Sequence, residues 1–413
     1  MNREEVPLGP HMMNTLKSIQ SEIDTILPEV TALRHDLHQH PELAYEEKRT
    51  AGKVLEFIAG VKDLDIRESV GGTGLVITMG KELDGPCVAL RADMDALPIE
   101  EESGVEWSSR IPGKMHACGH DGHTAMLAGA IRILDGLRES LKGPVKFLFQ
   151  PAEEGGAGAD KMCKEGALEN PSVDAVFALH NNLPDSSMKI GSIAYTPGAS
   201  MAGTGNFDIT VTGKGGHAAF PHKTIDPIYV GSAIVDEIQG IVSRYIDPLV
   251  PAVVSVTRFH AGSAYNIIPG SAKISGTIRA LDRDVLVSLR RHLIERAETV
   301  AAAHGGTAHV ECELAYPVLM NDPKAEAVFK AILQETGDIG KLVEVKPILG
   351  GEDFAFYGEH APAFFYFLPS CPLNEDSNPV CHHPSFDFND DLLPEGMRLH
   401  VELASRFADH WNH

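Results

Sequence analysis

Apolar residues recur along the chain in two alternating patterns, one helical and one strand-like. Helical spacing runs through residues 14–60 and again through 126–137. Short apolar runs of the kind found in buried strands follow at 75–79, 87–90, 145–149 and 175–179. Because strands alternate with helices, this half of the chain predicts an α/β fold with a mostly parallel sheet.

The pattern changes near residue 196. Strands are predicted at 207–211, 253–259, 272–280 and 308–314, and helices at 227–245 and 285–302. The resulting order, β-α-β-β-α-β, is that of a ferredoxin-like sandwich. Since 413 residues exceed the size of a single core, we expect one domain formed by 14–195 and 316–413, with 196–315 inserted as a second.

Residues 1–13 are expected to form a leader that is disordered or added to the native chain. The run Gly9-Pro10-His11-Met12 resembles the remnant of a protease cleavage site, which places the native start near Met12 or Met13. No apolar run approaches a membrane span in length, and the N-terminus lacks an apolar signal core. The sequence therefore predicts a cytoplasmic protein.

The net charge adds an argument about partners. It is −23, from 35 basic and 58 acidic residues. Nucleic acids and anionic membranes select basic surfaces, so neither is an expected partner. An anionic small molecule is not excluded, because it needs only a local Arg or Lys.

Polar clusters begin where the predicted strands of the first domain stop. They are 91–95, 150–156 and 180–182, and in an open α/β sheet ligands bind beyond the carboxyl ends of strands. A further stretch, 115–123, holds three histidines and a cysteine among glycines that allow sharp turns. Thiolate, imidazole and carboxylate are ligands of borderline divalent ions, so these segments predict a metal site.

The candidate ligands come from four separated loops: Cys118, His120, Glu154, His180 and one of His382 or His383. Five ligands exceed the four of a closed structural zinc site. The layout instead suits two metals that share ligands in an open hydrolytic site, roughly 3.5–4 Å apart.

Glu153 is adjacent to the candidate ligand Glu154. Consecutive residues of an extended loop point in different directions, so Glu154 can hold a metal while Glu153 faces the attacking water as a general base. Taken alone, the pair would be read as two solvated glutamates. Asp93 and Asp95 are candidates for orienting ligand imidazoles, with strand-end capping an equal alternative for Asp93. His123 is expected to support the site or cap a helix.

Four motifs in combination resemble one enzyme family. They are 90–98 (LRADMDALP), 116–121 (HACGHD), 150–155 (QPAEEG) and 350–354 (GGEDF). Together they resemble the amidohydrolase branch of the aminoacylase/carboxypeptidase-type di-metal peptidases, over nearly the whole chain. That branch includes hippurate hydrolases, N-acyl-amino-acid deacetylases and auxin-conjugate hydrolases. The resemblance implies an α/β catalytic domain with an inserted βαββαβ domain that acts as a lid and dimerises.

The resemblance also implies roles for individual residues. It favours His382, in a His-x-Pro pattern, as the fifth ligand, assigns the general base to Glu153, and leaves Cys118 as the choice for a bridging ligand. His217 corresponds to a histidine that reaches the developing oxyanion, often from the partner subunit. Asn266, Arg279 and Gly351 correspond to substrate-binding positions, and an Arg fork suits a substrate carboxylate.

The resulting hypothesis is metal-dependent hydrolysis of N-acyl-amino acids by a homodimer. Two divalent ions per subunit are expected, zinc or manganese first, with nickel or cobalt as substitutes. Three alternatives remain open. The first is a dipeptidase or carboxypeptidase acting on unblocked peptides, which a substrate panel would separate. The second is a catalytically silent metal-binding relative, which would lack Glu153 or a ligand. The third is a cysteine hydrolase built on Cys118, whose activity would survive a chelator.

Overall fold

The chain divides into two units. This computed structural model describes residues 10–181, 190–370 and 380–411. The first unit consists of Met1–Gly198, Met320–Lys346 and Asp353–His413, and the second of Ala199–Leu319 and Pro347–Glu352. Pro347–Glu352 was predicted to belong to the first domain. Hydrogen bonds from Ala202 N to Gly350 O (2.9 Å) and from Ile348 N to Ser200 O (3.1 Å) instead tie it to the second unit.

The expected leader is only partly described, since residues 1–9 lie outside the described ranges. Residues 10–13 belong to the first helix, α1 (Pro10–Gln39), rather than to a disordered segment. Among the described residues, no helix combines the length and apolarity needed to cross a membrane.

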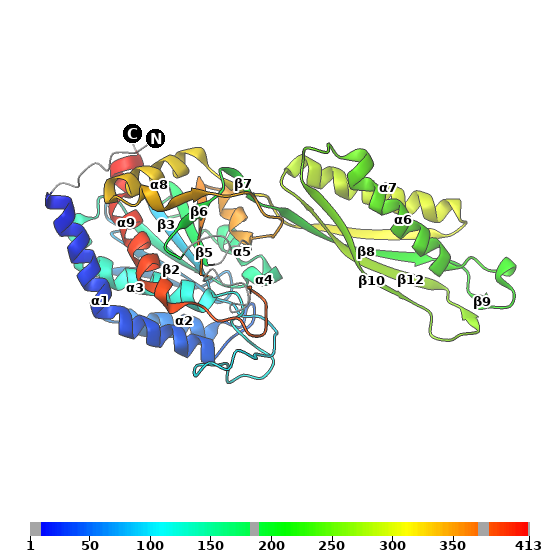
Figure 1. Ribbon diagram of the computed structural model, residues 1–413, viewed down its shortest axis with the longest axis horizontal. Coiled ribbons are helices and arrows are strands. Elements are labelled where there is room, and N and C mark those ends of the chain that lie inside the picture. Colours follow the sequence, from blue (N-terminus) through cyan, green and yellow to red (C-terminus); the bar gives the residue numbers. More distant parts are fainter. Residues whose placement is uncertain (1–9, 182–189, 371–379, 412–413) are drawn as a thin grey trace. The chain divides into compact units, whose positions relative to one another are not determined.

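The first unit is built on an eight-stranded mixed sheet (Figure 1). Its strands, in spatial order, are β1 (Leu64–Val70), β2 (Gly74–Met79), β4 (Val145–Gln150), β3 (Val88–Asp93), β5 (Ala175–Asn181), β16 (Ala363–Leu368), β6 (Ile193–Tyr195) and β15 (Leu342–Glu344). The four central strands are parallel. The pairs β1–β2, β2–β4 and β6–β16 are antiparallel, whereas β6–β15 at the edge is parallel, so the sheet is mixed although parallel pairs outnumber antiparallel ones.

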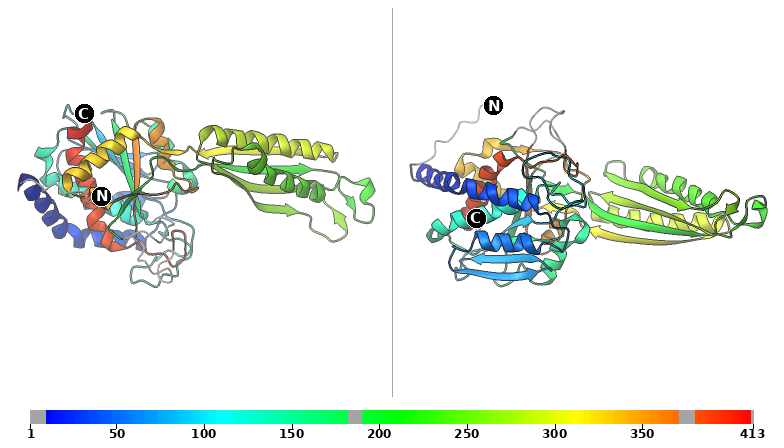
Figure 2. Two further views of the ribbon diagram at one scale, coloured as in Figure 1. Left: turned by 45° about the horizontal axis from the view of Figure 1, so that its top comes forward. Right: turned by 90° about the horizontal axis from the view of Figure 1, so that it is seen from below.

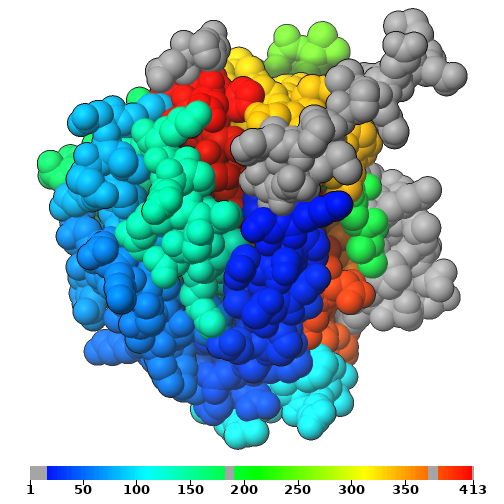
Figure 3. Space-filling model, turned by 90° about the vertical axis from the view of Figure 1, so that its left-hand side faces the viewer, coloured from blue at the N-terminus to red at the C-terminus, as the bar shows by residue number. Residues whose placement is uncertain are grey.

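The helices of the first unit pack on this sheet. They are α1, α2 (Lys48–Phe57), α3 (His120–Gly136), α4 (Glu153–Gly156), α5 (Gly158–Lys164), α8 (Pro323–Thr336) and α9 (Leu393–Trp411), with short 3₁₀ turns at Arg138–Ser140, Ile339–Lys341, Asp353–Glu359 and Asp390–Leu392. α3 lies between α1 and α9 and is buried on nearly all sides, beyond the single apolar face that its sequence predicts. α1 (blue) and α9 (red) reach the surface beside it (Figure 3).

Strands β4, β3 and β5 run side by side and end at the same edge of the sheet. The register pairs Asp93 with Gln150, and Arg91 with Ala178. All residues of β3 and β4 are buried, as expected for strands covered on both faces. Arg91 and Asp93 are the last polar residues of β3 itself, not of a following loop. This edge therefore collects the polar side chains of three strands.

The second unit is a four-stranded antiparallel sheet carrying two helices, which Figure 2 shows from two sides. Its elements are β8 (Gly203–Thr212), α6 (Pro227–Tyr245), β10 (Ala252–Ala261), β12 (Ser271–Ala280), α7 (Arg283–Ala303) and β13 (Thr307–Tyr316), in the spatial strand order β10-β12-β8-β13. The element order is the β-α-β-β-α-β read from the sequence. Short strands β9 (Gly216–His217) and β11 (Ile267–Ile268) and a 3₁₀ turn (Pro221–Lys223) complete the second unit, and the short strands β7 (Gly198–Met201) and β14 (Leu319–Asn321) include the residues at which the chain passes between the units.

Local sequence explains the elements of the second unit. In β8, Phe207, Ile209 and Val211 are buried, and the residues between them are exposed or half-buried. Asp226 and Asp282 cap α6 and α7 by accepting backbone N–H bonds at 2.9 Å. One face of the sheet thus forms a core with both helices.

Candidate metal centre and catalytic turn

A sharp turn at Gly119 separates the first two candidate ligands. Gly119 is left-handed (φ 89°) and directly precedes α3, so Cys118 lies before the turn and His120 opens the helix. A Cβ at Gly119 would lie 2.2 Å from Asn181 Oδ1, which only glycine avoids. The turn therefore packs directly against the end of β5, where the third candidate, His180, is found.

His120 is fully buried and held by Asp95. Its Nδ1 donates to the Asp95 carbonyl oxygen at 2.8 Å, which directs Nε2 away from this contact. No described residue offers Nε2 a hydrogen-bond partner, although the atom is buried. Burial lowers the pKa of His120, but Asp93 and Asp95 outweigh it and raise that pKa to about 10. This nitrogen is buried, lacks a hydrogen-bond partner in the described part of the chain and lies among carboxylates. Such a nitrogen has the surroundings of a ligand to a cation.

Cys118 and His180 face each other. Cys118 Sγ lies 3.5 Å from His180 Nε2, while His180 Nδ1 donates to the carbonyl oxygen of Asn181. A hydrogen bond with Cys381, burial and nearby carboxylates raise the pKa of the Cys118 thiol well above its ordinary value. Without a cation this thiol stays protonated, so the site gains a thiolate ligand only when a metal stabilises it.

Glu154 and His382 complete the set. Glu154 Oε1 lies 3.0 Å from His382 Nε2. The backbone N–H of His382 donates to Ala117 O at 2.7 Å, which places this distant segment beside Cys118. The ligand atoms of Cys118, His120 and Glu154 all lie within 4.8 Å of one another. Three of the predicted ligands thus form one cluster, with His180 beside Cys118 and His382 beside Glu154, and their thiol, imidazole and carboxylate groups fit a borderline divalent ion.

His123 and Asp93 lie beside these ligands, but the ring nitrogens of His123 and the carboxylate oxygens of Asp93 already have hydrogen-bond partners. His123 Nδ1 contacts Asp93 Oδ1 at 2.6 Å, and His123 Nε2 contacts Asn181 Oδ1 at 2.7 Å. Arg91 Nη1 donates to Asp93 Oδ2 at 2.6 Å. Asp93 was expected to orient a ligand imidazole. Its shortest imidazole contact is instead to His123, and His120 Nε2 lies 3.6 Å away.

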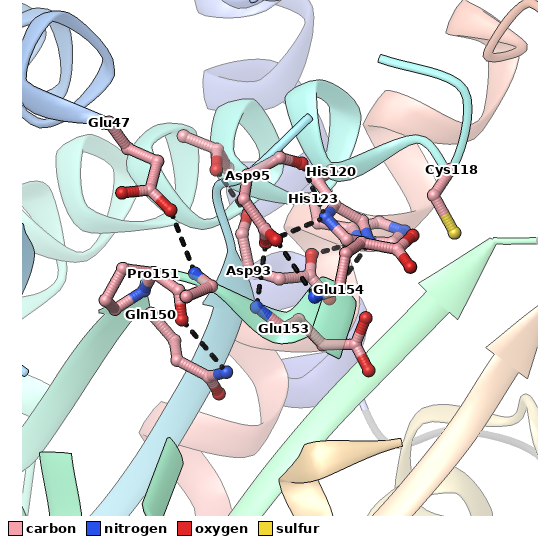
Figure 4. A network of polar contacts seen from close by, with 12 residues as sticks. Glu47, Asp93, Asp95, Cys118, His120, His123, Gln150, Pro151, Glu153 and Glu154 are labelled. Atoms are coloured by element: carbon pink, nitrogen blue, oxygen red, sulfur yellow. Dashed lines mark hydrogen bonds and ion pairs between the residues drawn. The ribbon is translucent and has the colours of Figure 1, made fainter. Parts of the chain in front are cut away.

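Glu153 and Glu154 lie in a tight turn, not in the extended loop that the sequence suggested. The Asp95 carboxylate holds it, accepting Glu153 N–H at Oδ1 (3.0 Å) and Glu154 N–H at Oδ2 (2.9 Å). The same carboxylate also lies 3.4 Å from His120 Nδ1, so the expected contact with a ligand imidazole is present beside the main-chain bond. Figure 4 shows Glu154 beside His120 and Cys118, with Glu153 lying apart.

The Glu153 side chain is buried, with 7% exposure. Its Oε1 accepts the backbone N–H of Asp353 at 3.3 Å. Asp353 is anchored in turn by Gln150 Nε2 (2.7 Å) and Arg91 Nη2 (3.2 Å). Glu153 is thus a buried carboxylate outside the group formed by Cys118, His120 and Glu154, and a general base must be distinct from the metal ligands in this way.

The remaining candidates lie in the second unit. His217 is exposed on β9, which pairs with β11, and its Nδ1 accepts Ala219 N–H at 3.1 Å. Asn266 is exposed, and its backbone carbonyl oxygen accepts Ala218 N–H at 3.0 Å. Arg279 is half-buried, and its Nη1 donates to Leu349 O at 3.0 Å.

Gly351, also in the second unit, packs tightly. A Cβ there would lie 2.6 Å from Thr204 Cγ2, so any side chain would displace the segment. His217 and Asn266 are adjacent on paired backbone, which their separation in sequence does not reveal.

Sequence reasoning missed several supports of the site: Asn181, Arg91, Gln150, Asp353 and Glu47. Asn181 carried a usable signal, because it directly follows a candidate ligand at a strand end. Arg91, Gln150 and Asp353 all lie in quoted motifs, but their pairing across up to 262 residues leaves no local pattern.

The motif resemblance is confirmed by comparison with known proteins. The model of peptidase family M20/M25/M40 matches residues 89–406. The chain belongs to this family. It is 39% identical over 384 residues to "IAA-amino acid hydrolase ILR1-like 4" of Arabidopsis thaliana, covering 92% of this chain and 85% of that protein. It is 37% identical over 392 residues to "N-acetyl-L-cysteine deacetylase" of Bacillus subtilis, covering 94% and 90%.

Among solved structures, this M20 family chain matches the YXEP protein of Bacillus subtilis, described as a dinuclear metal-binding peptidase. The TM-score is 0.79 at 32% identity, covering 94% of this chain and 99% of that one. The α/β fold of this family, the membership of the amidohydrolase branch and the prediction of a metal-dependent amidohydrolase are thereby confirmed.

Proposed function

We propose that this M20 family hydrolase cleaves the amide bond of N-acyl-amino acids, releasing a free amino acid and a carboxylic acid. The observation that carries the proposal is Glu153, a buried carboxylate held beside the ligand cluster but outside it. The names of the relatives support this substrate class, since one is a deacetylase of N-acetyl-L-cysteine and another hydrolyses IAA-amino acids.

Two divalent ions, zinc or manganese, are the proposed cofactors. They would be held by Cys118, His120, Glu154, His180 and His382. Bound there, such ions polarise the scissile carbonyl and lower the pKa of water. Metal-stripped protein reloaded separately with zinc, manganese, cobalt or nickel would identify the ion that restores turnover.

The side chains of the protein then transfer the proton, stabilise the oxyanion and bind the substrate carboxylate. Glu153 takes a proton from the attacking water and returns it to the leaving nitrogen, whose C–N bond breaks. His217, from the same or the partner subunit, donates a hydrogen bond to the oxyanion of the tetrahedral state. Arg279, Asn266 and Gly351 bind the free carboxylate of the amino acid.

The inserted domain predicted at residues 196–315 is proposed to act as a lid and to form the interface of a homodimer. The expected partners are therefore a second copy of the chain and a small N-acyl-amino acid. The cytoplasm remains the predicted compartment. Light scattering of the purified protein tests the dimer directly.

The decisive experiment is Glu153→Gln. The amide has nearly the shape of the carboxylate but cannot take a proton, so kcat should fall by about 10²–10⁴. Because Glu153 is not a proposed ligand, metal per chain should be unchanged by elemental analysis. Near-normal turnover in this variant would end the assignment of the base.

A second function is favoured by one observation: the solved relative is described as a peptidase. A dipeptidase or carboxypeptidase would use the same carboxylate-binding residues but accept a free amino group. A panel of acetyl-, benzoyl- and aminoacyl-amino acids separates the two. Preference for the aminoacyl substrates in kcat/KM would replace the proposed function with this one.

A further inference from the structure

Three consecutive backbone amides of the catalytic turn donate to two buried carboxylates. Asp95 accepts the N–H of Glu153 and Glu154, as described above. The third carboxylate oxygen in this arrangement is Glu47 Oε1, which accepts Ala152 N–H at 2.9 Å. Figure 4 shows this contact reaching the turn from outside the ligand cluster. Converging N–H groups of this kind form a concave site for an anion, and here the anions are side chains of the protein.

The turn adopts a conformation that its sequence does not favour by itself. Ala152 is left-handed (φ 55°, ψ 46°), which is uncommon for any residue other than glycine. Glu154 lies outside the helical region (φ −72°, ψ 73°), and Gly155 is again left-handed (φ 84°). Such a backbone persists only where surrounding contacts impose it. At its first residue, Ala152 N–H donates to Glu47, and Ala152 O accepts Gly158 N–H at 3.1 Å.

Glu47 is itself rigidly held. It is fully buried directly before α2. Its Oε1 also accepts Tyr45 N–H at 3.0 Å, and its Oε2 accepts the hydroxyl of Thr73. The Tyr45 hydroxyl donates to Gly156 O, at the far end of the turn. Residues 45–47 therefore form hydrogen bonds with both ends of the segment that contains Glu153 and Glu154.

We infer that Glu47 is a positioning residue that sets the direction of the Glu153 carboxylate by holding the Ala152 amide. The inference rests on the proposed role of Glu153 as general base. Without Glu47, the Ala152 N–H would be buried without an acceptor, and the left-handed backbone would relax. The side chains of Glu153 and Glu154 would then lose their present orientation relative to the ligand cluster.

The first test compares Glu47→Ala with Glu47→Gln in the full-length, metal-loaded protein. Alanine removes the acceptor, so kcat should fall by about 10–100-fold while KM changes little. Glutamine retains an oxygen for the Ala152 amide, so it should restore most of the rate. Unchanged kcat in folded Glu47→Ala overturns the inference, as does a loss in Glu47→Gln equal to that in Glu47→Ala.

A double-mutant cycle with Glu153→Gln separates positioning from general structural damage. If Glu47 acts through Glu153, adding Glu47→Ala to Glu153→Gln should lower the residual kcat by less than about twofold when both proteins are assayed at saturating metal, which offsets the weaker binding at Glu154. Multiplication of the two single losses overturns the inference. Should Glu47→Ala fail to fold, Thr73→Val removes one bond to Glu47 at nearly constant shape and should lower kcat by about 2–5-fold in the same cycle.

Glu42 provides a matched control from the same segment. Its carboxylate accepts the backbone N–H groups of Arg49 (3.1 Å) and Thr50 (2.8 Å) in α2, and these bonds do not involve the catalytic turn. Glu42→Ala should therefore lower thermal stability without the kcat loss. A kcat loss equal to that of Glu47→Ala would show that any damage near α2 suffices, and would overturn the inference.

A binding measurement keeps this inference distinct from the proposed function. Mn²⁺ titration followed by electron paramagnetic resonance needs no substrate. Because Glu154 lies in the same turn, Glu47→Ala should weaken Mn²⁺ binding by about 10-fold, and Glu47→Gln and Glu42→Ala should not. If the wild-type protein hydrolyses none of the panel amides, the proposed function fails, and this titration still decides whether Glu47 positions the turn.

Discussion

The two units hold their candidate residues in opposite ways. In the first unit, His120 and Glu153 are buried and fixed by hydrogen bonds from several strand ends. In the second, His217 and Asn266 lie exposed on a short strand pair and its flank. The first unit therefore organises its chemistry within its own fold. The second unit holds the His217 ring by a hydrogen bond from Ala219 N–H, at an exposed position.

This difference has an electrostatic side. The first unit gathers carboxylates in a buried region, where each ionised group must be matched by a cation or by hydrogen-bond donors. Arg91 neutralises part of this charge through Asp93 and Asp353. The remaining negative charge faces the ligand cluster and favours a divalent cation there. No comparable buried charge is needed on the exposed β9–β11 pair.

The strongest way to break the comparison is to remove a buried ligand. Cys118→Ala should lower the metal content per chain and reduce turnover to background, because the remaining ligands cannot replace the thiolate. Elemental analysis and kinetics on the same preparation measure both. Cys87→Ala is the control, since Cys87 is also a buried free cysteine but lies outside the ligand cluster. Unchanged stoichiometry in Cys118→Ala would exclude this residue as a ligand.

The next effect concerns the exposed side of the comparison. His217→Ala should lower kcat by about 10²–10³, the usual loss of one oxyanion donor, with metal content unchanged. His222→Ala, a nearby exposed histidine, is the control and should leave kcat unaltered. Loss of metal in His217→Ala would instead place this histidine with the ligands and contradict the division between the units.

Much of the first unit could be predicted because its central strands are continuous apolar runs. The runs at 75–79, 87–90, 145–149 and 175–179 all lie within β2, β3, β4 and β5 or overlap them closely. The flanks could not be predicted in the same way. Strands β6 and β15 contain three residues each and pair across a long stretch of sequence. Periodicity needs more residues than that to show a direction or a partner.

The candidate site, too, was predictable where single residues carry a local signal and not where distant residues pair. Cys118, His120 and Glu154 were readable because metal chemistry restricts the residue types that can serve. Their supports were not readable, because a hydrogen bond such as Ala152 to Glu47 joins ordinary residues 105 positions apart. Asp95 shows the limit most clearly. Its contact with a ligand imidazole was predicted, but its hydrogen bonds to the backbone of the catalytic turn were not, because they depend on three-dimensional geometry.

A smaller effect is expected at Arg279, which sharpens the role of the second unit. Arg279→Ala should raise KM about 10-fold for an N-acyl-amino acid, with kcat less affected, because one charge-assisted contact to the carboxylate is lost. Arg279→Lys should recover only part of the affinity, since the planar fork is absent. The matching test uses the carboxamide of the same substrate. An equal rise in KM for that neutral compound would show that Arg279 does not bind the carboxylate.

Substitution of His38, a buried histidine behind the ligand cluster, is expected to have the smallest effect on turnover. Its effect on stability should still be measurable. His38 Nδ1 contacts Asp121 Oδ2 at 2.8 Å, and Nε2 contacts Glu101 Oε1 at 3.2 Å. Burial lowers the pKa of His38, but Asp121 and Glu101 outweigh it and raise that pKa to about 9. The ordinary value is about 6.5. The protonated ring therefore stabilises the folded state fully below about pH 6.5, and this contribution disappears as the pH rises through about 9.

The shift corresponds to about 3 kcal/mol of unfolding free energy. His38→Gln removes the titrating group, so the stability difference between wild type and variant should shrink by that amount between pH 6.5 and 9.5 in metal-free protein. Urea unfolding followed by tryptophan fluorescence reports on the correct unit, because the only two tryptophans, Trp107 and Trp411, both belong to the first. A difference that stays constant across this pH range would mean that His38 is neutral in the folded protein. The buried charges of the first unit would then be balanced by Arg34, which also contacts Asp121, at 3.0 Å.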